Sequence, residues 1–321
     1  VRMAVLDPSD DVLTRRIIEQ LDASEYFTLS ARFQTPQEMD EAFRRSQVDM
    51  AVVFTPDFSD RLYTGESAVQ LVCDATDPNT ATMQTSYATG IIAAATRQLL
   101  PAGVSVPAIQ PEVKLLYNPQ MKSVYNFVPG VMGLILMLIC AMMTSISIVR
   151  EKETGTMEVL LVSPVRPFFL ILSKAVPYFV LSFVNLATIL LLSVYVLHVP
   201  VAGSLLWLVA VSLLFIFVSL SLGLLISTVT QTQVAAMLAS GLMLMMPTML
   251  LSGMIFPVES MPWVLQGISA LIPARWYIQA VRKLMIQGVD VVNVLSEVAV
   301  LSGMAVLLIT VSLKKFKNRL E

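Results

Sequence analysis

The sequence has few of the residues that metal sites and disulfide frameworks need. Its 321 residues include two cysteines and one histidine, Cys73, Cys140 and His198, and none has a second cysteine or histidine at metal-ligand spacing. The two cysteines lie in regions of different character, which makes a disulfide bond between them implausible. We expect both to be buried as small hydrophobic residues, and we expect no metal site.

Charged residues are also scarce, at 14% of the chain, and the formal net charge is -2. Nucleic-acid binding needs a clustered basic surface, and none occurs outside the extreme C-terminus, so nucleic acid is excluded as a partner. None of the 13 glycines is followed by lysine, so the phosphate-binding sequence G-x-x-x-x-G-K-[ST] is absent. The sequence therefore predicts no ATP site and no other cofactor in this chain.

Hydrophobic residues dominate instead, at 56% of the sequence, and the mean hydropathy is +0.74. This composition is typical of a polytopic membrane protein. The charges are unevenly placed, with 16 acidic and 10 basic residues in 1–126 and 7 acidic and 11 basic residues in 127–321. The pattern predicts a polar, mildly acidic domain, 1–126, followed by a membrane domain, 127–321.

Five stretches with few charges are long enough to cross a bilayer, which takes about 20 apolar residues. Each is apolar on all sides, as expected for a helix surrounded by lipid or by other membrane helices. The predicted spans are 127–149, 175–197, 204–227, 234–256 and 291–313.

The region 257–290 has a different pattern, because prolines and basic residues divide it into two amphipathic pieces of about 12 to 14 residues. These pieces are shorter than the about 20 residues that a span requires. They are typical of re-entrant or interfacial helices, and the aromatic residues Trp263, Trp276 and Tyr277 are expected at headgroup depth.

Lysine and arginine counts predict the orientation of the five spans. One side of the membrane collects eight basic residues and the other three, and the richer side is predicted to be cytoplasmic. Residues 1–126 would then lie outside the cell membrane and the C-terminus in the cytoplasm. The eight are Arg150, Lys152, Arg166, Lys174, Lys314, Lys315, Lys317 and Arg319, and the three are Arg275, Arg282 and Lys283.

The outer domain alternates strand-like and helix-like segments, which predicts an α/β fold. Asp10 is a suitable start signal for the first helix, and Thr35-Pro36 for the second. The carboxylate pairs Asp10–Asp11 and Asp74–Asp77 are better explained as loop-edge residues than as acid/base catalysts, so no active site is expected. The expected strands are 2–7, 26–33, 49–55, 69–74 and 112–118, and the helices 9–22, 36–46 and 79–100.

The sequence begins with a predicted strand at Val1, and a domain outside the cytoplasm needs a segment that directs its translocation across the membrane. We expect an in-frame upstream segment of about 20 apolar residues that forms a sixth span.

The spans are nearly free of ionisable side chains, which proton- or sodium-coupled carriers keep within the membrane for function. Glu297 is the exception, near the outer end of the last span. It is interpreted preferentially as a snorkelling or rim-facing carboxylate and alternatively as a substrate contact in the translocation path. The energy for any transport is therefore expected from another subunit.

The segment REKETGTMEVLLVSP, residues 150–164, combines charge with a short apolar helix. Its first four residues extend the preceding span, Thr154-Gly155-Thr156 interrupts it, and Thr156 can cap a helix that includes Glu158. Such a segment can dock on a separate ATPase, although a solvated loop is an equally good explanation from these residues alone.

Several motifs, in the expected order, are similar to the permease subunits of type-2 ABC exporters with a large extracytoplasmic domain. They are REKETGTMEVLLVSP, the stretch LSGMIFPVESMPWVLQGISALIPARWYIQAVRKLMIQG at 251–288, and LDASEYF, VDMAVVFTPDFSDRLYTG and DATDPNTA in the outer domain. The resemblance covers essentially the whole chain. The family usually has six spans, so the resemblance implies a further helix ahead of the outer domain.

The resemblance implies an α-helical polytopic membrane domain joined to an α/β extracytoplasmic domain. It also implies that 150–167 is a cytoplasmic coupling loop resting on the ATPase. The implied coupling residues are Arg150, Glu151, Lys152, Glu153, Thr154, Gly155, Thr156 and Glu158.

The implied function is that of a permease subunit of an ATP-driven exporter in the bacterial inner membrane, and not that of an enzyme. Expected partners are an ABC ATPase subunit that carries ATP and Mg, a second permease in a homo- or heterodimer, the lipid bilayer and a periplasmic adaptor. Pro247 and Gly253 are expected to let their span bend. The expected substrate is a drug or a lipid-like amphipathic molecule. The alternative is a non-transporting scaffold whose outer domain binds a periplasmic partner.

Overall fold

The computed structural model of the protein describes residues 1–62, 68–99, 111–155 and 167–317. The chain divides into two compact units, Val1–Tyr125 and Asn126–Glu321. The boundary lies one residue before the position that composition indicated.

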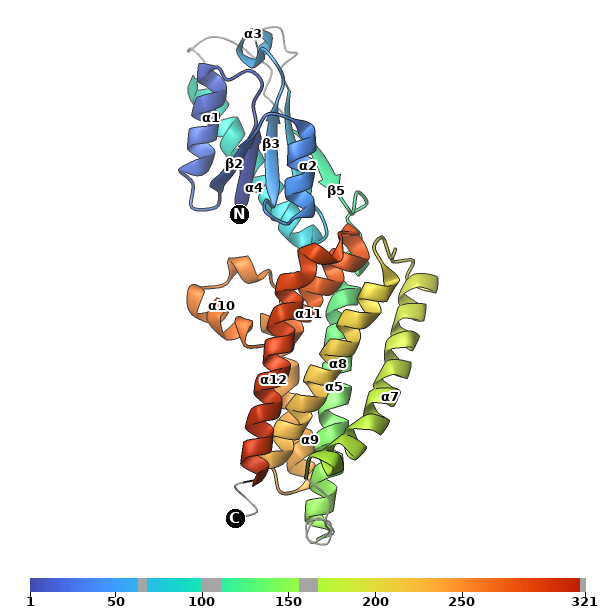
Figure 1. The fold of residues 1–321 in the computed structure, drawn as a ribbon. Helices are drawn as coiled ribbons and strands as arrows, with labels where there is room; N and C mark the ends of the chain where they lie inside the picture. The colour runs from blue at the N-terminus through green and yellow to red at the C-terminus, as the bar shows by residue number, and fades with distance from the viewer. Residues whose placement is uncertain (63–67, 100–110, 156–166, 318–321) are drawn as a thin grey trace. The chain divides into compact units, whose positions relative to one another are not determined.

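The first unit alternates strands with helices, as the sequence predicted. Its elements are β1 (Arg2–Leu6), α1 (Val12–Asp22), β2 (Thr28–Phe33), α2 (Pro36–Arg44), β3 (Met50–Phe54), α3 (Phe58–Leu62), β4 (Val69–Asp74), α4 (Pro78–Leu99) and β5 (Glu112–Leu116). The strands form one sheet in the order β2-β1-β3-β4-β5 (Figure 1). The pair β3–β4 is antiparallel and the other three neighbouring pairs are parallel.

Helices cover both faces of this sheet, because successive side chains of a strand point to opposite faces. Val5 of β1 belongs to a buried cluster that also contains Ile17 of α1 and Ile92 of α4. The preceding residue, Ala4, belongs to a second cluster with Phe43 of α2. Burial on both faces explains why the strands are nearly continuous apolar runs.

The start signals of the first two helices were predicted with mixed success. Thr35 caps α2 as predicted, because its side chain accepts a hydrogen bond from the backbone of Glu38 at 3.3 Å. The prediction for α1 was wrong, since the cap is Asp11 and not Asp10. The Asp11 carboxylate accepts from Thr14 N at 2.9 Å, whereas Asp10 adopts a positive φ and pairs with Arg15.

The second unit is helical. Among its described residues, five helices are long and apolar enough to cross a membrane, as expected. Figure 1 shows them side by side as a bundle. They are α5 (Val124–Glu153), α7 (Pro167–Tyr195), α8 (Leu205–Val229), α9 (Gln233–Leu251) and α12 (Leu295–Lys317).

Glycines let α5 pack closely against two neighbours. A Cβ on Gly223 of α8 would lie 2.4 Å from the carbonyl oxygen of Ala141 in α5. A Cβ on Gly133 of α5 would lie 2.9 Å from the side chain of Ile278. Both distances are too short for a real Cβ, so these positions need glycine for close helix contact, a common device in membrane bundles.

The region between α9 and α12 contains short helices, as predicted. They are η1 (Val258–Ser260), α10 (Trp263–Ala270), α11 (Pro273–Arg282), the π-helix η2 (Lys283–Gln287) and η3 (Val291–Val294). The helices α10 and α11 have 8 and 10 residues, which correspond to about 12 to 15 Å and are too short to cross a bilayer.

The aromatic residues of this region differ in their surroundings. Trp263 is 84% exposed, as an interfacial anchor would be. The same expectation for Tyr277 was wrong, because Tyr277 is fully buried. Its ring stacks on Phe215 with centroids 4.1 Å apart, and its hydroxyl lies 2.8 Å from Ser212 Oγ. Tyr277 therefore fastens α11 to α8.

The predicted bend residues of the fourth span occupy different positions. Pro247 lies inside α9, but the helix ends at Leu251, and Gly253 follows it with φ +81°. The prediction that Gly253 bends the span was therefore wrong: Gly253 takes a left-handed conformation that favours glycine and lies beyond the helix. Its carbonyl accepts a hydrogen bond from Arg282 Nη2 at 2.6 Å.

Candidate functional site

The candidate site is the charged end of α5, which we define as residues Arg150–Gly155. The helix continues to Glu153, and Gly155 N donates to Lys152 O at 3.3 Å just beyond it. Gly155 has φ +75°, and nothing lies within 4 Å of the position that a Cβ would occupy. The predicted interruption is thus a glycine-dependent helix end, as at many helix C-termini.

Lys152 binds α8 within the same chain. Its ammonium group donates a hydrogen bond to the carbonyl oxygen of Ser227. Ser227 lies in the last turn of α8, where carbonyl groups have no partner inside the helix and carry partial negative charge. A lysine is therefore well matched to this position.

Glu153 binds the beginning of α9. Its Oε2 atom accepts hydrogen bonds from the backbone N of Gln233 at 3.1 Å and from Gln233 Nε2 at 3.0 Å. The first turn of a helix has unpaired N–H groups and partial positive charge, so a carboxylate is favoured there. Thr232 completes the cap by accepting from Ala235 N at 3.2 Å.

The charged end of α5 thus combines internal contacts with exposed groups. Arg150, Glu153, Thr154 and Gly155 are exposed. Lys152 holds the last turn of α8, and the exposed Glu153 carboxylate holds the first turn of α9. Glu151 is half-buried. Thr156 and Glu158, also predicted for this site, lie outside the described residues.

Ser227 and Gln233 were not predicted as partners of the charged end of α5, because they lie 75 and 80 residues along the chain from Lys152 and Glu153. A weak signal was available in Thr232, a good N-cap residue directly before an apolar span. Nothing in the sequence indicated that Glu153 would meet that helix start.

Glu297 has a structural role in this fold. It is 5% exposed, and its Oε1 accepts a hydrogen bond from Lys283 Nζ at 2.8 Å while Oε2 accepts from Ser296 Oγ at 2.8 Å. Lys283 also donates to Asn293 O at 3.2 Å. The snorkelling interpretation was therefore wrong, because both carboxylate oxygens have partners inside the protein.

Arg275 and Arg282, the other two basic residues between α9 and α12, also make contacts that stabilise the fold. Arg275 Nη1 donates to Gln266 O of α10 at 3.1 Å, and Arg282 donates to Gly253 O just past α9. With Lys283, each cation joins the segment 273–287 to a different neighbour. These charges therefore hold short helices together.

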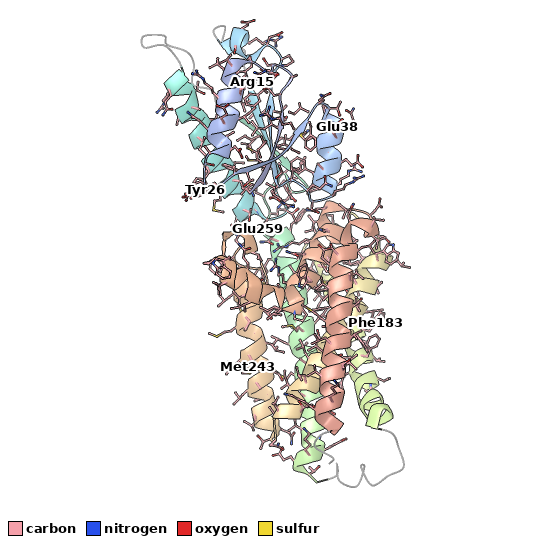
Figure 2. All side chains as sticks on the ribbon, turned by 60° about the vertical axis from the view of Figure 1, so that its left-hand side comes forward. Arg15, Tyr26, Glu38, Phe183, Met243 and Glu259 are labelled. Carbon is pink, nitrogen blue, oxygen red and sulfur yellow. The ribbon has the colours of Figure 1, made fainter. Side chains whose placement is uncertain are left out.

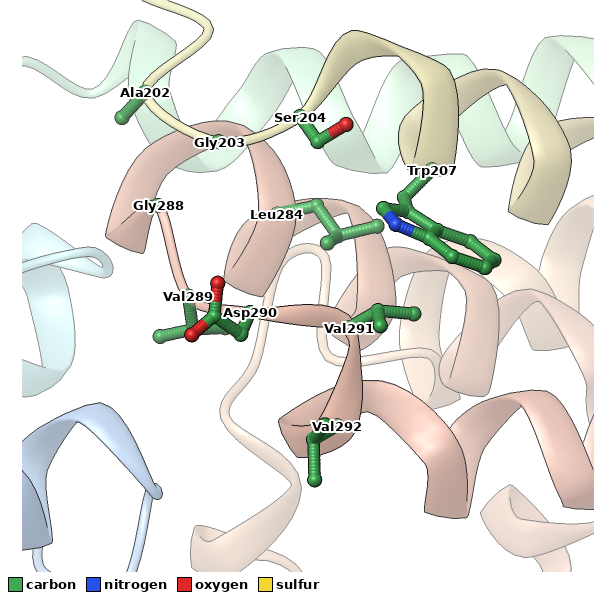
Figure 3. A pocket seen from close by; sticks show the side chains of 10 residues that line it. All are labelled: Ala202, Gly203, Ser204, Trp207, Leu284, Gly288, Val289, Asp290, Val291 and Val292. Carbon is green, nitrogen blue, oxygen red and sulfur yellow. The ribbon is translucent and has the colours of Figure 1, made fainter.

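A pocket of about 510 Å³ lies between the α7–α8 connection and the segment that precedes α12. Figure 3 shows the Trp207 indole and the Asp290 carboxylate among its lining side chains. The backbones of its two walls are joined by a hydrogen bond from Gly203 N to Leu284 O at 3.0 Å. None of the residues predicted for function lines this pocket.

Apolar side chains cover the outer faces of α7 and α9. Phe183 and Met243 point outward in Figure 2, and they are 46% and 73% exposed. In the apolar 18-residue stretch that could span the membrane, only 17% is buried in α7 and in α9, against 56% in α8. The two faces suit contact with lipid or with another membrane helix.

Comparison with known proteins places this chain in a family. The family described as "ABC-2 family transporter protein" matches residues 1–314. The chain is 32% identical over 289 residues to "Probable multidrug ABC transporter permease YbhS" of Escherichia coli (strain K12), covering 89% of this chain and 77% of the relative. It is 27% identical over 286 residues to "Probable multidrug ABC transporter permease YbhR" of the same organism, with the same coverage.

A third relative is "Inner membrane transport permease YhhJ" of Escherichia coli (strain K12). It is 25% identical over 324 residues, which cover 98% of this chain and 85% of the relative.

Proposed function

Because this chain belongs to the ABC-2 family of transporter proteins, we propose that it is the permease subunit of an ATP-driven exporter. The observation that carries this proposal is the family match over residues 1–314, which includes both units. ATP and Mg would bind to a separate ATPase subunit, since the chain has no phosphate-binding loop motif.

The charged end of α5 is the proposed contact with this ATPase. It ends at an exposed glycine, presents the Arg150 side chain to solvent, and leads directly into the segment 156–166. The excess of basic residues predicted on the side of the membrane that holds the charged end of α5 supports a cytoplasmic location for that end and an extracytoplasmic location for residues 1–126. ATP-driven closure of the ATPases would then shift the permease between two states.

The proposed assembly contains a second permease, either a copy of this chain or a related one. The exposed apolar faces of α7 and α9 support such a contact, although lipid would also cover them. The proposed substrate is a drug or a lipid-like amphipathic molecule, supported by the apolar spans and by the multidrug permease names of two relatives. A periplasmic adaptor is proposed as a partner of the α/β unit. The second candidate function is a non-transporting scaffold.

An ATPase capture experiment separates these two functions. The tagged chain would be purified from its host membrane in mild detergent and tested for a co-purifying ATPase subunit and for ATP hydrolysis. Reconstituted vesicles would then be tested for ATP-dependent transport of ethidium, an amphipathic cation. If the chain is a permease, we expect ATP hydrolysis by the purified complex and ATP-dependent ethidium transport. If it is a scaffold, we expect neither.

Variants of Gly155 test the coupling role directly. Gly155→Val should reduce ethidium transport and stimulated ATP hydrolysis, because a β-branched residue is strained at φ +75°. Gly155→Asn is the matched control, since asparagine tolerates this conformation and should keep most of the activity. Glu158→Lys should reduce coupling by charge reversal, while membrane insertion stays normal. Wild-type rates in Gly155→Val and Glu158→Lys would refute the coupling role.

A further inference from the structure

A seam of side-chain contacts joins α5 to α9. The two helices are antiparallel, and three contacts between them recur every seven or eight residues on each helix. Near the middle, Ser145 Oγ lies 2.8 Å from Ser240 Oγ, and both side chains are buried. The three levels of the seam are Glu153–Gln233, Ser145–Ser240 and Met137–Thr248, and Gly130 of α5 closely approaches Met254 just past the end of α9.

Much of the surface of α9 is exposed in the part of the chain that the structure describes, so each contact that it makes with a neighbouring helix matters for its position. Residues on the opposite face, such as Leu242 and Met243, are 65% and 73% exposed. By contrast, α5 is held tightly by α8 and α11 at its glycine contacts. The position of α9 is thus set by its contacts on α5 together with its packing against α8, α10 and α11.

The seam begins at the charged end of α5. Glu153 is the last residue of α5, two residues before Gly155 with its positive φ. An acidic residue in the last turn of α5 is unfavourable for the dipole of that helix. The same carboxylate is favourable at the first turn of α9, where it accepts two hydrogen bonds from Gln233.

We propose that Glu153 is a positioning residue that transmits displacement of the charged end of α5 to α9 through Gln233. The inference rests on the proposed function, since that displacement would come from the ATPase. When the end of α5 moves, the first turn of α9 moves with it, and the buried Ser145–Ser240 contact keeps the two helices in register. The exposed apolar face of α9 then changes position in each cycle.

The first test replaces the carboxylate. Glu153→Ala should lower the amount of ethidium transported per ATP hydrolysed about fivefold or more, the lower range of coupling between two sites. Co-purification of the ATPase is measured in parallel, and transport is normalised to the amount of ATPase bound. Glu153→Gln should keep most transport, because its amide oxygen can accept the same two hydrogen bonds. Val234→Ala changes an exposed neighbour of Gln233 and should have no effect. Unchanged transport in Glu153→Ala would overturn the proposal.

The second test compensates for the lost Glu153–Gln233 contact with a disulfide bond between α5 and α9. In a chain whose native cysteines are changed to alanine, Ser145→Cys and Ser240→Cys place two thiols at a contact where the hydroxyls now lie 2.8 Å apart. Oxidation to a disulfide should leave transport intact and should restore transport to Glu153→Ala. Loss of transport on oxidation would overturn the proposal, because it would mean that α5 and α9 must separate.

Failure of the proposed function gives a different result. If the unaltered chain neither captures an ATPase nor transports ethidium in an ATP-dependent manner, the exporter function and the transmission role are both overturned. If the unaltered complex transports ethidium and Glu153→Ala matches it, the transmission role alone is wrong.

Discussion

Lys283 and Glu297 form a buried ion pair at the junction of η2 and α12, with Nζ and Oε1 2.8 Å apart. The side chains are 17% and 6% exposed, and Ser296 and the Asn293 carbonyl satisfy further hydrogen-bonding groups. Ionisable residues inside membrane bundles are costly unless they are paired in this way. The pair therefore fixes the π-helix against the last span.

Breaking this pair should destabilise the protein more than removing it. Glu297→Ala leaves the Lys283 ammonium buried without its carboxylate, at an expected cost of about 3 to 5 kcal/mol. The double variant Lys283→Met/Glu297→Leu replaces both charges with apolar side chains of similar size. Its free energy of unfolding should lie within about 1 kcal/mol of that of the natural chain. Thermal unfolding in detergent micelles measures both. Equal stability of Glu297→Ala and the natural chain would contradict the structural role.

Glycine at the α5–α8 contact should resist substitution. Gly223→Ala places a Cβ 2.4 Å from the backbone oxygen of Ala141, which cannot rotate away, so the helices must separate. We expect the free energy of unfolding to fall by about 1 to 3 kcal/mol. Gly303→Ala is the matched control, because nothing lies within 4 Å of its Cβ position in α12, and alanine should be neutral or stabilising. Unfolding curves of the two variants should therefore shift differently, and similar shifts would rule out the steric explanation.

Much of the fold could be predicted because hydrophobic periodicity is a local property. The five long helices and the strands of the α/β unit were recognised from apolar runs whose lengths match a bilayer or a buried strand. The antiparallel pairing of β4 with β3 was not predicted, since the sequence of a strand does not specify its direction. The end of α9 was misplaced because Ile255 and Phe256 continue the apolar pattern beyond Gly253, where the chain turns.

The residues that α5 contributes to the candidate site could be predicted, but their partners on α8 and α9 could not. A charged, glycine-interrupted segment after an apolar span is visible in the sequence, so residues 150–155 were identified. Their contacts depend on how helices distant in the chain pack together. Charge alone suggested that Lys152 and Glu153 were available to a partner, but the fold commits them to Ser227 and Gln233. The Lys283–Glu297 pair was missed for the same reason.

Asp11 should stabilise α1 in a pH-dependent manner. Partial burial tends to raise the pKa of its carboxyl group, but hydrogen bonds from Thr14, Ser59 and Ser9 outweigh this effect and lower the pKa to about 2. Because this pKa is below the usual value, the unfolded chain binds more protons, and the stabilisation is present above about pH 4 and lost as the pH falls toward 2.

The test is Asp11→Ala in the intact chain, monitored by amide hydrogen exchange of α1. At pH 7 we expect a loss of protection equivalent to about 1 kcal/mol, the usual value of an N-cap, and a smaller loss near pH 3. Asp10→Asn is the control, because asparagine tolerates the positive φ of this position and the exposed pair that Asp10 makes with Arg15 should contribute little. A larger effect from Asp10→Asn would show that the cap is wrongly assigned.

Membrane orientation is the last prediction, and the structure changes how it must be tested. Cys73 lies in the α/β unit, but it is fully buried, and burial together with nearby Asp74 raises its pKa to about 12. We therefore expect no maleimide labelling of Cys73 in the folded protein.

Better reporters are Gln37→Cys on α2 and Thr154→Cys at the charged end of α5, because both positions are exposed. Each would be introduced singly after Cys73 and Cys140 are replaced by alanine, and the chain without cysteines is the control. With a maleimide that does not cross the inner membrane, we expect Gln37→Cys to be labelled in intact spheroplasts and Thr154→Cys only after the membrane is broken. This expectation follows from the excess of basic residues at the end of unit 2 that carries Thr154. The reverse labelling pattern would place the α/β unit in the cytoplasm and refute both the orientation and the ATPase contact at α5.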